Sequence, residues 1–416
     1  FVRQDENVIT VLNPGSYSRP LLFEADLGGK KLITENGITL KGQKTHNGWI
    51  YYGEKIIKPF SSIKLLISEK AEAEESDDYF SDGRVLENQF IRVFVNDDGT
   101  IKIYDKDFGR EVFKNSGNKL FMYDDVPPKW DAWDIDVDYE KSGYQLKAQE
   151  IRKAENGEIR QIIRVKYKIN NTEIIQDYVL DNNSKRLDIR TNVDWHHRKT
   201  LLRASFPVNV LSRVAKYDIG TGYIERPTHA NTDFERARFE SVAHRWMDLS
   251  EGNFGVSLLN NGKYGHNCSG NVMGISLLRS PVFPHFFADE GKHSFTYSIY
   301  SHNGKNVLDT MKQAERLNKS LVIIEGNPSH VGSLIEISEA NFKVLTVKRN
   351  EQGGIILRIA ETLGARGKAC IRINYFDYSG VWLSNILEEK KKELNVKNGK
   401  IEVEYEPFKI YTFLFE

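Results

Sequence analysis

Residues 91–103 read Ile-Arg-Val-Phe-Val-Asn-Asp-Asp-Gly-Thr-Ile-Lys-Ile, and this stretch decides the fold class. Its β-branched residues recur at every second position, before and after the dipeptide Asp98-Gly99. A period of two is typical of a strand with one buried face, and Asp-Gly is a preferred two-residue turn between paired strands. The stretch therefore predicts a β-hairpin.

The same signals recur along the chain. Asn156-Gly157 lies between Ile151 and an alternating run, and similar alternation marks residues 159–169, 178–189, 295–299, 355–359, 371–375 and 408–415. One stretch predicts an amphipathic helix, because residues 306–318 place Val307, Leu308, Met311 and Ala314 on one face. Many short strands separated by turns indicate an all-β protein built of sandwiches rather than a parallel sheet.

The length of the chain predicts more than one domain. A single core stops growing near ~250–300 residues, and the chain has 416. The acidic stretch Glu69–Asp82 suggests a linker, and a second boundary follows the predicted helix. We expect a small β-domain at 1–75, a large sandwich at 84–317 and a C-terminal β-sandwich at 318–416.

Composition excludes several classes of protein. Lys+Arg and Asp+Glu are equal at 58 each, which argues against nucleic acid or an anionic membrane as partner. No apolar run approaches the ~20 residues needed to span a bilayer. Cys268 and Cys370 are too few for a disulfide framework, so a reducing, cytoplasmic setting is expected. The chain starts at Phe1 without a signal-peptide pattern, which suggests a piece of a longer polypeptide.

Two segments of the middle region carry candidate binding residues. Trp130, Asp131, Trp133 and Asp134 follow two prolines, and indoles beside carboxylates suit a sugar surface. The alternative is that an indole is core and the carboxylates cap turns. The second segment, residues 223–232, contains Arg226 and His229 and is predicted to be a long exposed connection over 225–231.

Other polar clusters favour structural roles. His196 and His197 are adjacent, so on a strand they point to opposite faces and do not readily share a metal. The stretch His244–Asp248 reads as a buried strand with internal hydrogen bonds. The chain contains no P-loop, G-x-G-x-x-G, nucleophile elbow or H-E-x-x-H motif.

Taken together, these segments resemble the C-terminal half of family 38 α-mannosidases, especially the cytosolic and microbial branch. The stretches that carry the resemblance cover most of the chain; they are Trp130–Asp134, Val193–Pro207, Arg226–Glu251, Gly255–Gly265, Leu277–Pro281 and Ala288–Tyr297, with weaker similarity at Val8–Pro14 and Leu357–Gly367.

The resemblance implies a large mutarotase-like supersandwich flanked by smaller β-sandwich domains. It also implies retaining hydrolysis of α-mannosides by an N-terminal catalytic domain of the same polypeptide, which holds the nucleophile, the acid/base carboxylate and zinc or another divalent metal. No motif of that domain occurs here, so neither a catalytic residue nor a metal ligand is assigned, and this portion by itself is predicted to be inactive. The family also brings an arginine from the supersandwich to the substrate, which nominates Arg226. The implied partner is an α-mannoside oligosaccharide, and a homo-oligomer is an open possibility.

Two rival interpretations stay open at this stage. A stand-alone mutarotase or epimerase would need a histidine and a carboxylate for proton transfer, for which His229, His244 and Glu240 are available. A carbohydrate-binding or structural module would need no chemistry at all.

Overall fold

The computed structural model describes residues 2–46, 48–68 and 83–416, with 55% of the chain in strands and 5% in helices. The described residues fall into two compact units. Unit 1 holds those of 1–75, 220–223 and 315–416, and unit 2 holds those of 76–219 and 224–314. The predicted all-β class is confirmed. The expected linker Glu69–Asp82 lies outside the described residues, and the three-domain division stays a prediction.

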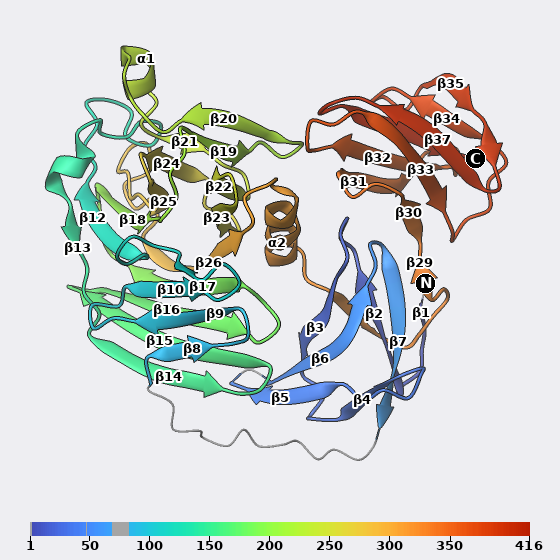
Figure 1. Cartoon of the computed structure of the whole chain (residues 1–416), viewed down its shortest axis with the longest axis horizontal. Coiled ribbons are helices and arrows are strands. Elements are labelled where there is room, and N and C mark those ends of the chain that lie inside the picture. Colours follow the sequence, from blue (N-terminus) through green and yellow to red (C-terminus); the bar gives the residue numbers. More distant parts are fainter. Residues whose placement is uncertain (1, 47, 69–82) are drawn as a thin grey trace. The chain divides into compact units, whose positions relative to one another are not determined.

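Unit 2 is built around a nine-stranded sheet, whose long strands run side by side in Figure 1. In spatial order its strands are β14 (Glu150–Asn156), β15 (Arg160–Ile169), β16 (Thr172–Asp181), β17 (Arg186–Trp195), β26 (Gly291–His302), β23 (Phe254–Asn260), β22 (Trp246–Glu251), β19 (Val214–Asp218) and β20 (Tyr223–Pro227). The central pairs from β14 to β22 are antiparallel. Antiparallel pairing lets one face of each strand be buried, which explains the alternation in the sequence.

Two further sheets complete unit 2. The six-stranded sheet has the order β13 (Tyr144–Gln145), β12 (Lys119–Asp124), β18 (Thr200–Pro207), β25 (Val272–Leu278), β24 (Gly265–Ser269) and β21 (Ser241–Val242). The four-stranded sheet has the order β11 (Arg110–Glu111), β10 (Ile101–Asp105), β9 (Ile91–Val95) and β8 (Val85–Glu87). Side chains from all three sheets share one hydrophobic core that runs from Leu86 to Ile299.

The hairpin predicted from residues 91–103 is present. β9 pairs with β10 so that Val95 faces Ile101, and the turn places Gly99 at φ +86°. A β-carbon at this position would lie 2.2 Å from the hydroxyl of Tyr167. Gly99 is therefore required for two reasons: the positive φ angle and the close approach of the buried Tyr167 side chain.

The helices are short and few in the described part of the chain: η1 (Tyr139–Ser142), α1 (Asp233–Arg236) and α2 (Leu308–Asn318). α2 confirms the predicted amphipathic helix, with Val307, Met311 and Ala314 buried. None of the described helices is long and apolar enough to cross a membrane.

Unit 1 contains two separate hydrophobic cores. The first lies between the sheet β27 (Val322–Glu325), β2 (Val8–Asn13), β7 (Ser61–Ser68) and β29 (Gly332–Ser333), with β4 (Lys31–Thr34) also paired to β7, and the sheet β3 (Arg19–Ala25), β6 (Gly48–Ile57) and β5 (Lys41–Thr45). β1 (Val2–Arg3) pairs with β28 (Asn327–Pro328).

The second core of unit 1 is a sandwich of two facing layers, drawn in red in Figure 1. One layer is β30 (Ile335–Ile337), β33 (Gly367–Ile373), β37 (Lys400–Tyr405) and β36 (Val396–Lys397); the other is β31 (Phe342–Arg349), β32 (Ile355–Glu361), β38 (Ile410–Phe415), β34 (Val381–Ser384) and β35 (Lys390–Leu394). Smaller β-sandwich structure beside the large one is thereby confirmed.

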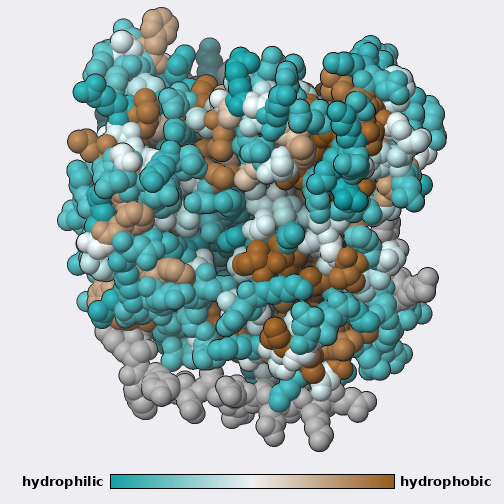
Figure 2. All heavy atoms as spheres, turned by 45° about the vertical axis from the view of Figure 1, so that its right-hand side comes forward, coloured by the Kyte–Doolittle hydropathy of each residue, from teal (hydrophilic) through white to brown (hydrophobic). Residues whose placement is uncertain are grey.

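The face of the molecule shown in Figure 2 is mostly hydrophilic, with apolar residues in separate patches. Such patches are normal on a folded protein, because there is too little polar surface to cover it completely.

Candidate functional site

A pocket of about 300 Å³ in unit 2 brings together two of the six predicted binding residues, Arg226 and His229. η1, β20, α1 and β24 supply most of its wall. The lining residues that the argument uses are Tyr139, Glu140, Glu225, Arg226, His229, Glu235, Arg236, Arg238 and Asn267. A volume of this size is at the lower end for small-molecule sites.

Arg226 lies on β20, at the edge of the nine-stranded sheet. The prediction of an exposed connection over 225–231 is wrong for Glu225–Pro227, which continue the strand. An edge strand tolerates proline, because one row of its backbone groups needs no partner in the sheet. The guanidinium carbon of Arg226 is 5.9 Å from the ring centroid of Tyr217. Its Nε is buried without a hydrogen-bond partner among the described residues, and the side chain lines the pocket.

His229 lies in the loop after β20, where a capping box orders the chain. The carboxylate of Glu235 accepts hydrogen bonds from the backbone N–H groups of Asn231 at 2.7 Å and Thr232 at 2.9 Å. These bonds hold the pKa of Glu235 below its ordinary value. The Nδ1 of His229 is 3.6 Å from Glu235 Oε2. His229 is therefore held on the rim of the pocket by the cap of α1.

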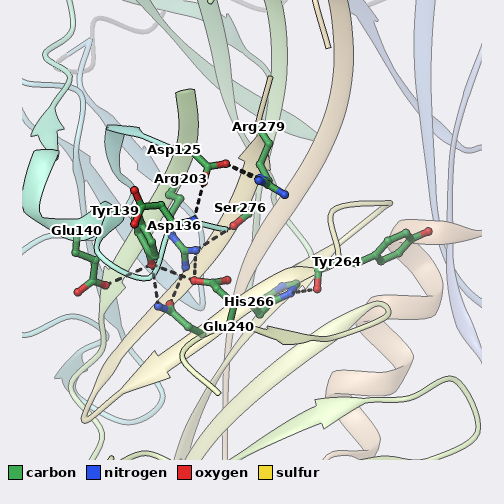
Figure 3. A network of polar contacts seen from close by, with 11 residues as sticks. Asp125, Asp136, Tyr139, Glu140, Arg203, Glu240, Tyr264, His266, Ser276 and Arg279 are labelled. Carbon is green, nitrogen blue, oxygen red and sulfur yellow. Dashed lines mark hydrogen bonds and ion pairs between the residues drawn. The ribbon is translucent and has the colours of Figure 1, made fainter. Parts of the chain in front are cut away.

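Beneath the pocket lies a buried polar network, shown in Figure 3. Arg203 on β18 has a side chain only 5% exposed and donates hydrogen bonds to Glu240, to Ser276 Oγ at 3.0 Å and to Asn267 Oδ1 at 2.8 Å. The Tyr139 hydroxyl donates to Glu240 Oε1 at 3.0 Å. Tyr139 and Asn267 also line the pocket, so the network determines where these two side chains lie.

Burial controls the protonation of the network. It raises the pKa of the Tyr139 hydroxyl and, against the opposing effect of Arg203, the pKa of the Glu240 carboxyl. It lowers the pKa of the nearby His266 to about 4, so this imidazole is neutral at pH 7. It also raises the pKa of the Cys268 thiol to about 12, which makes this cysteine a poor nucleophile.

Three of these network residues were not found by sequence reasoning: Tyr139, Arg203 and Asn267. The one signal for Arg203 is its position in the apolar stretch Leu201-Leu-Arg-Ala-Ser-Phe206, where a buried charge requires a partner. That partner, Glu240, is 37 residues away, and its identity is not readable from the sequence.

The three groups considered for a mutarotase each have a different partner. Glu240 is engaged by Arg203 and Tyr139, and His229 lies beside Glu235. The Nδ1 of His244 is 3.9 Å from Asp218 Oδ2. These contacts of the described residues therefore pair neither His229 nor His244 with Glu240.

The other four predicted residues lie in the segment Trp130–Asp134, whose two indoles form an aromatic cluster with Phe283. The centroid of the Trp130 ring is 6.2 Å from that of Trp133 and 5.6 Å from that of Phe283. The three side chains are 62%, 70% and 49% exposed. Such exposure of three neighbouring aromatic residues is unusual unless a ligand or partner uses them.

A charged side chain holds the segment that carries this cluster. Arg279 donates to Asp125 Oδ2 at 2.7 Å (Figure 3). It also donates to the backbone carbonyls of Asp131 and Asp134. The Asp131 carboxylate accepts from the backbone N–H of Val282 at 2.7 Å, and that of Asp134 accepts from the N–H of the next residue. Asp131 thus ties the segment to the distant residue Val282, Asp134 bonds its own neighbour, and both indoles are exposed.

The structure provides no metal site in the part that it describes. Among residues 2–46, 48–68 and 83–416, no three His, Cys, Asp or Glu side chains are grouped so that they could hold an ion. The Nε2 of His196 lies 3.0 Å from the Oδ1 of Asp194, near the end of β17. The resemblance places its metal in the catalytic domain, and the described residues here offer no grouping that fits zinc.

Comparison with known families gives two matches. Residues 86–324 match the model for the glycosyl hydrolases family 38 C-terminal domain. Residues 341–413 match the model for the glycosyl hydrolases family 38 C-terminal beta sandwich domain.

Similar proteins include alpha-mannosidase G of Dictyostelium discoideum, which is 34% identical over 80% of this chain and 32% of its own length. Alpha-mannosidase 2C1 of Homo sapiens is 32% identical over 80% of this chain and 34% of its own length. The chain thus spans about a third of the length of these relatives.

Among solved structures, an alpha-mannosidase from Enterococcus faecalis matches with a TM-score of 0.76 at 15% identity, over 99% of this chain and 56% of that one. This likeness supports the fold. The first family match by itself covers more than half of the chain, and it includes every residue of the pocket and of the aromatic cluster. The chain belongs to glycosyl hydrolase family 38 and is a C-terminal region of the α-mannosidase type.

Proposed function

We propose that this chain is the non-catalytic part of a retaining α-mannosidase and that it binds the substrate from one side while another part of the same polypeptide supplies the chemistry. The observation that carries the proposal is the guanidinium side chain of Arg226, which lines a pocket of monosaccharide size and lies near the Tyr217 ring. The two most similar relatives reported above are named α-mannosidases and are about three times as long as the region matched here. The nucleophile, the acid/base carboxylate and a divalent metal would come from the remainder.

The aromatic cluster extends this proposal. Trp130 and Trp133 present flat apolar faces on a loop that Arg279 holds in place, and such faces pack on the apolar side of a pyranose ring. The six residues Trp130, Asp131, Trp133, Asp134, Arg226 and His229 then divide by role. The two indoles, Arg226 and His229 would contact the oligosaccharide or the catalytic portion, and the two carboxylates would fix the loop.

The proposed setting is cytoplasmic, and it is supported by the free thiols of Cys268 and Cys370. A homo-oligomer is compatible with this setting and is readily tested by light scattering of the purified chain.

The isolated chain is expected to hydrolyse no α-mannoside, because the described residues offer neither a metal site nor an assigned pair of carboxylates. The test is incubation with an activated aryl α-mannoside in the presence of Zn²⁺, Mn²⁺ or Co²⁺, beside a heat-treated sample. The polypeptide that includes the catalytic portion serves as the positive control. Turnover by the isolated chain above the heated sample would contradict the division of labour proposed here.

Replacing both Trp130 and Trp133 by alanine is expected to weaken binding of a mannose oligosaccharide by roughly 0.5–1.5 kcal/mol for each ring. Quenching of intrinsic tryptophan fluorescence in the wild type, and isothermal titration of both proteins, give the affinities. The matched control is Trp382→Ala in unit 1, where the ring packs against Lys390. Equal affinities in the double variant and the wild type would show that the cluster serves another purpose, such as contact with the catalytic portion.

A further inference from the structure

Tyr139 and Asn267 have hydrogen-bonding capacity left over on the pocket side. The Tyr139 hydroxyl directs its proton to Glu240 Oε1 at 3.0 Å, with Glu140 Oε1 farther away at 3.4 Å, and its oxygen keeps a lone pair for an incoming donor. The Oδ1 of Asn267 accepts from Arg203, so the amide nitrogen of Asn267 is fixed as the donor end. That nitrogen makes one long contact, 3.5 Å, with the Tyr139 hydroxyl. An acceptor and a donor therefore lie next to each other on the pocket wall.

Both side chains are held rigidly. Tyr139 is 3% exposed, its ring centroid is 5.0 Å from that of Tyr123, and the guanidinium carbon of Arg203 is 5.4 Å from the ring. Arg203 in turn bonds Glu240 and Asn267 together. A wall that is ordered before the ligand arrives loses little conformational entropy on binding.

The charges around the pocket favour an uncharged ligand. Three carboxylates line it, those of Glu140, Glu225 and Glu235, and three guanidinium groups line it, those of Arg226, Arg236 and Arg238. Arg236 is already paired with Asp233, and the Oε2 of Glu235 accepts two backbone hydrogen bonds in the cap of α1. Neither an anion nor a cation would find a surplus of opposite charge here.

We propose that Tyr139 and Asn267 bind two neighbouring hydroxyl groups of one neutral sugar ring, with the guanidinium of Arg226 as a third contact. A vicinal diol presents a donor and an acceptor side by side, which matches the acceptor and donor on the wall. This inference rests on the proposed function for Arg226 and adds to it the chemical class of the ligand and two residues that specify it. Glu240 acts as a positioning residue, because it orients the Tyr139 hydroxyl without facing the pocket.

The test uses the 416-residue chain and methyl α-D-mannopyranoside, with its monodeoxy analogues, in ligand-observed NMR titrations. Tyr139→Phe is expected to bind the glycoside about 2- to 10-fold more weakly, the range for one neutral hydrogen bond. One monodeoxy analogue should bind the wild type more weakly than the parent sugar does, and this difference should vanish in Tyr139→Phe. A purely structural role for Tyr139 would weaken all the sugars alike.

The control is Tyr144→Phe, which removes a hydroxyl that contacts Met122 outside the pocket and should leave binding unchanged. Arg226→Gln separates this inference from the proposed function. If Arg226→Gln weakens binding and Tyr139→Phe does not, the diol site is overturned and the function proposed for Arg226 stands. The diol site would also be overturned if the wild-type chain failed to bind the sugar, or if millimolar inorganic phosphate displaced the sugar. The mannosidase proposal is tested separately, by turnover of the longer polypeptide.

Discussion

Replacing Asp248 by asparagine is expected to destabilise unit 2 by about 3–5 kcal/mol, the usual cost of breaking a buried ion pair by removing one partner. The Asp248 side chain is fully buried and lies 2.6 Å from the Nε2 of His302. It also accepts hydrogen bonds from Ser250 at 2.6 Å and Ser257 at 2.8 Å. An amide of the same shape removes the negative charge that these donors surround.

The contribution of Asp248 should depend on pH. His302 and the hydroxyl donors, acting against the cost of burial, hold the pKa of this carboxyl below its ordinary value. A depressed pKa in the folded state stabilises the protein above the unfolded pKa of ~3.9, and the contribution is lost as the pH falls through the folded value. The difference in stability between wild type and Asp248→Asn should therefore shrink as the pH falls into the acid range below ~3.9.

Urea unfolding, combined with hydrogen exchange of peptides from β22 and β23, measures this effect within unit 2. The control is Asp97→Asn, which removes a carboxylate that is 93% exposed and should change stability by less than ~0.5 kcal/mol. A result for Asp248→Asn as small as that of the control would show that the buried pair contributes no net stability.

The second large effect is expected at Arg226. In the polypeptide that includes the catalytic portion, Arg226→Gln should lower kcat/KM for an α-mannoside by about 10- to 150-fold, corresponding to ~1.5–3 kcal/mol for a charge-assisted hydrogen bond. The physical reason is that the Arg226 side chain lines the pocket, where its positive charge would donate to a ligand oxygen.

Steady-state kinetics of Arg226→Gln and Arg226→Lys distinguish between the possible roles of this side chain. A rise in KM with constant kcat would indicate ground-state binding, and an equal fall in kcat and kcat/KM would indicate a contact made in the transition state. Arg152→Gln on β14, where the side chain is 52% exposed, is the matched control. Unchanged kinetics in Arg226→Gln would contradict a contact with the substrate and would leave Arg226 as a structural part of the pocket wall beside Tyr217.

The fold class was predictable because a strand with one buried face shows alternating apolar and polar residues in its own sequence. The β9–β10 hairpin follows from alternating residues and an Asp-Gly turn, and α2 follows from four apolar residues at helical spacing. Strand β20 was missed because its polar composition resembles a loop. Its conformation comes from its place in the sheet order, next to β19, and not from its own side chains.

The binding residues divide in the same way. Arg226 was nominated by the family resemblance, and the indoles of Trp130 and Trp133 by their composition. The carboxylate of Asp134 bonds the N–H of the next residue, whereas that of Asp131 bonds the N–H of Val282, 151 residues away. The network of Arg203, Glu240, Tyr139 and Asn267 had no sequence signal beyond a charged residue in an apolar strand.

By itself the sequence determined that this is an all-β member of a sugar-hydrolase family, because side-chain periodicity and long characteristic strings are properties of contiguous residues. Only the tertiary structure decided which polar groups meet. Tyr139, Arg203, Glu240 and Asn267 come from four segments separated by up to 128 residues, and sheet pairing brings them under one pocket. A buried charge is stable only with a partner, and the choice of that partner depends on which strands become neighbours.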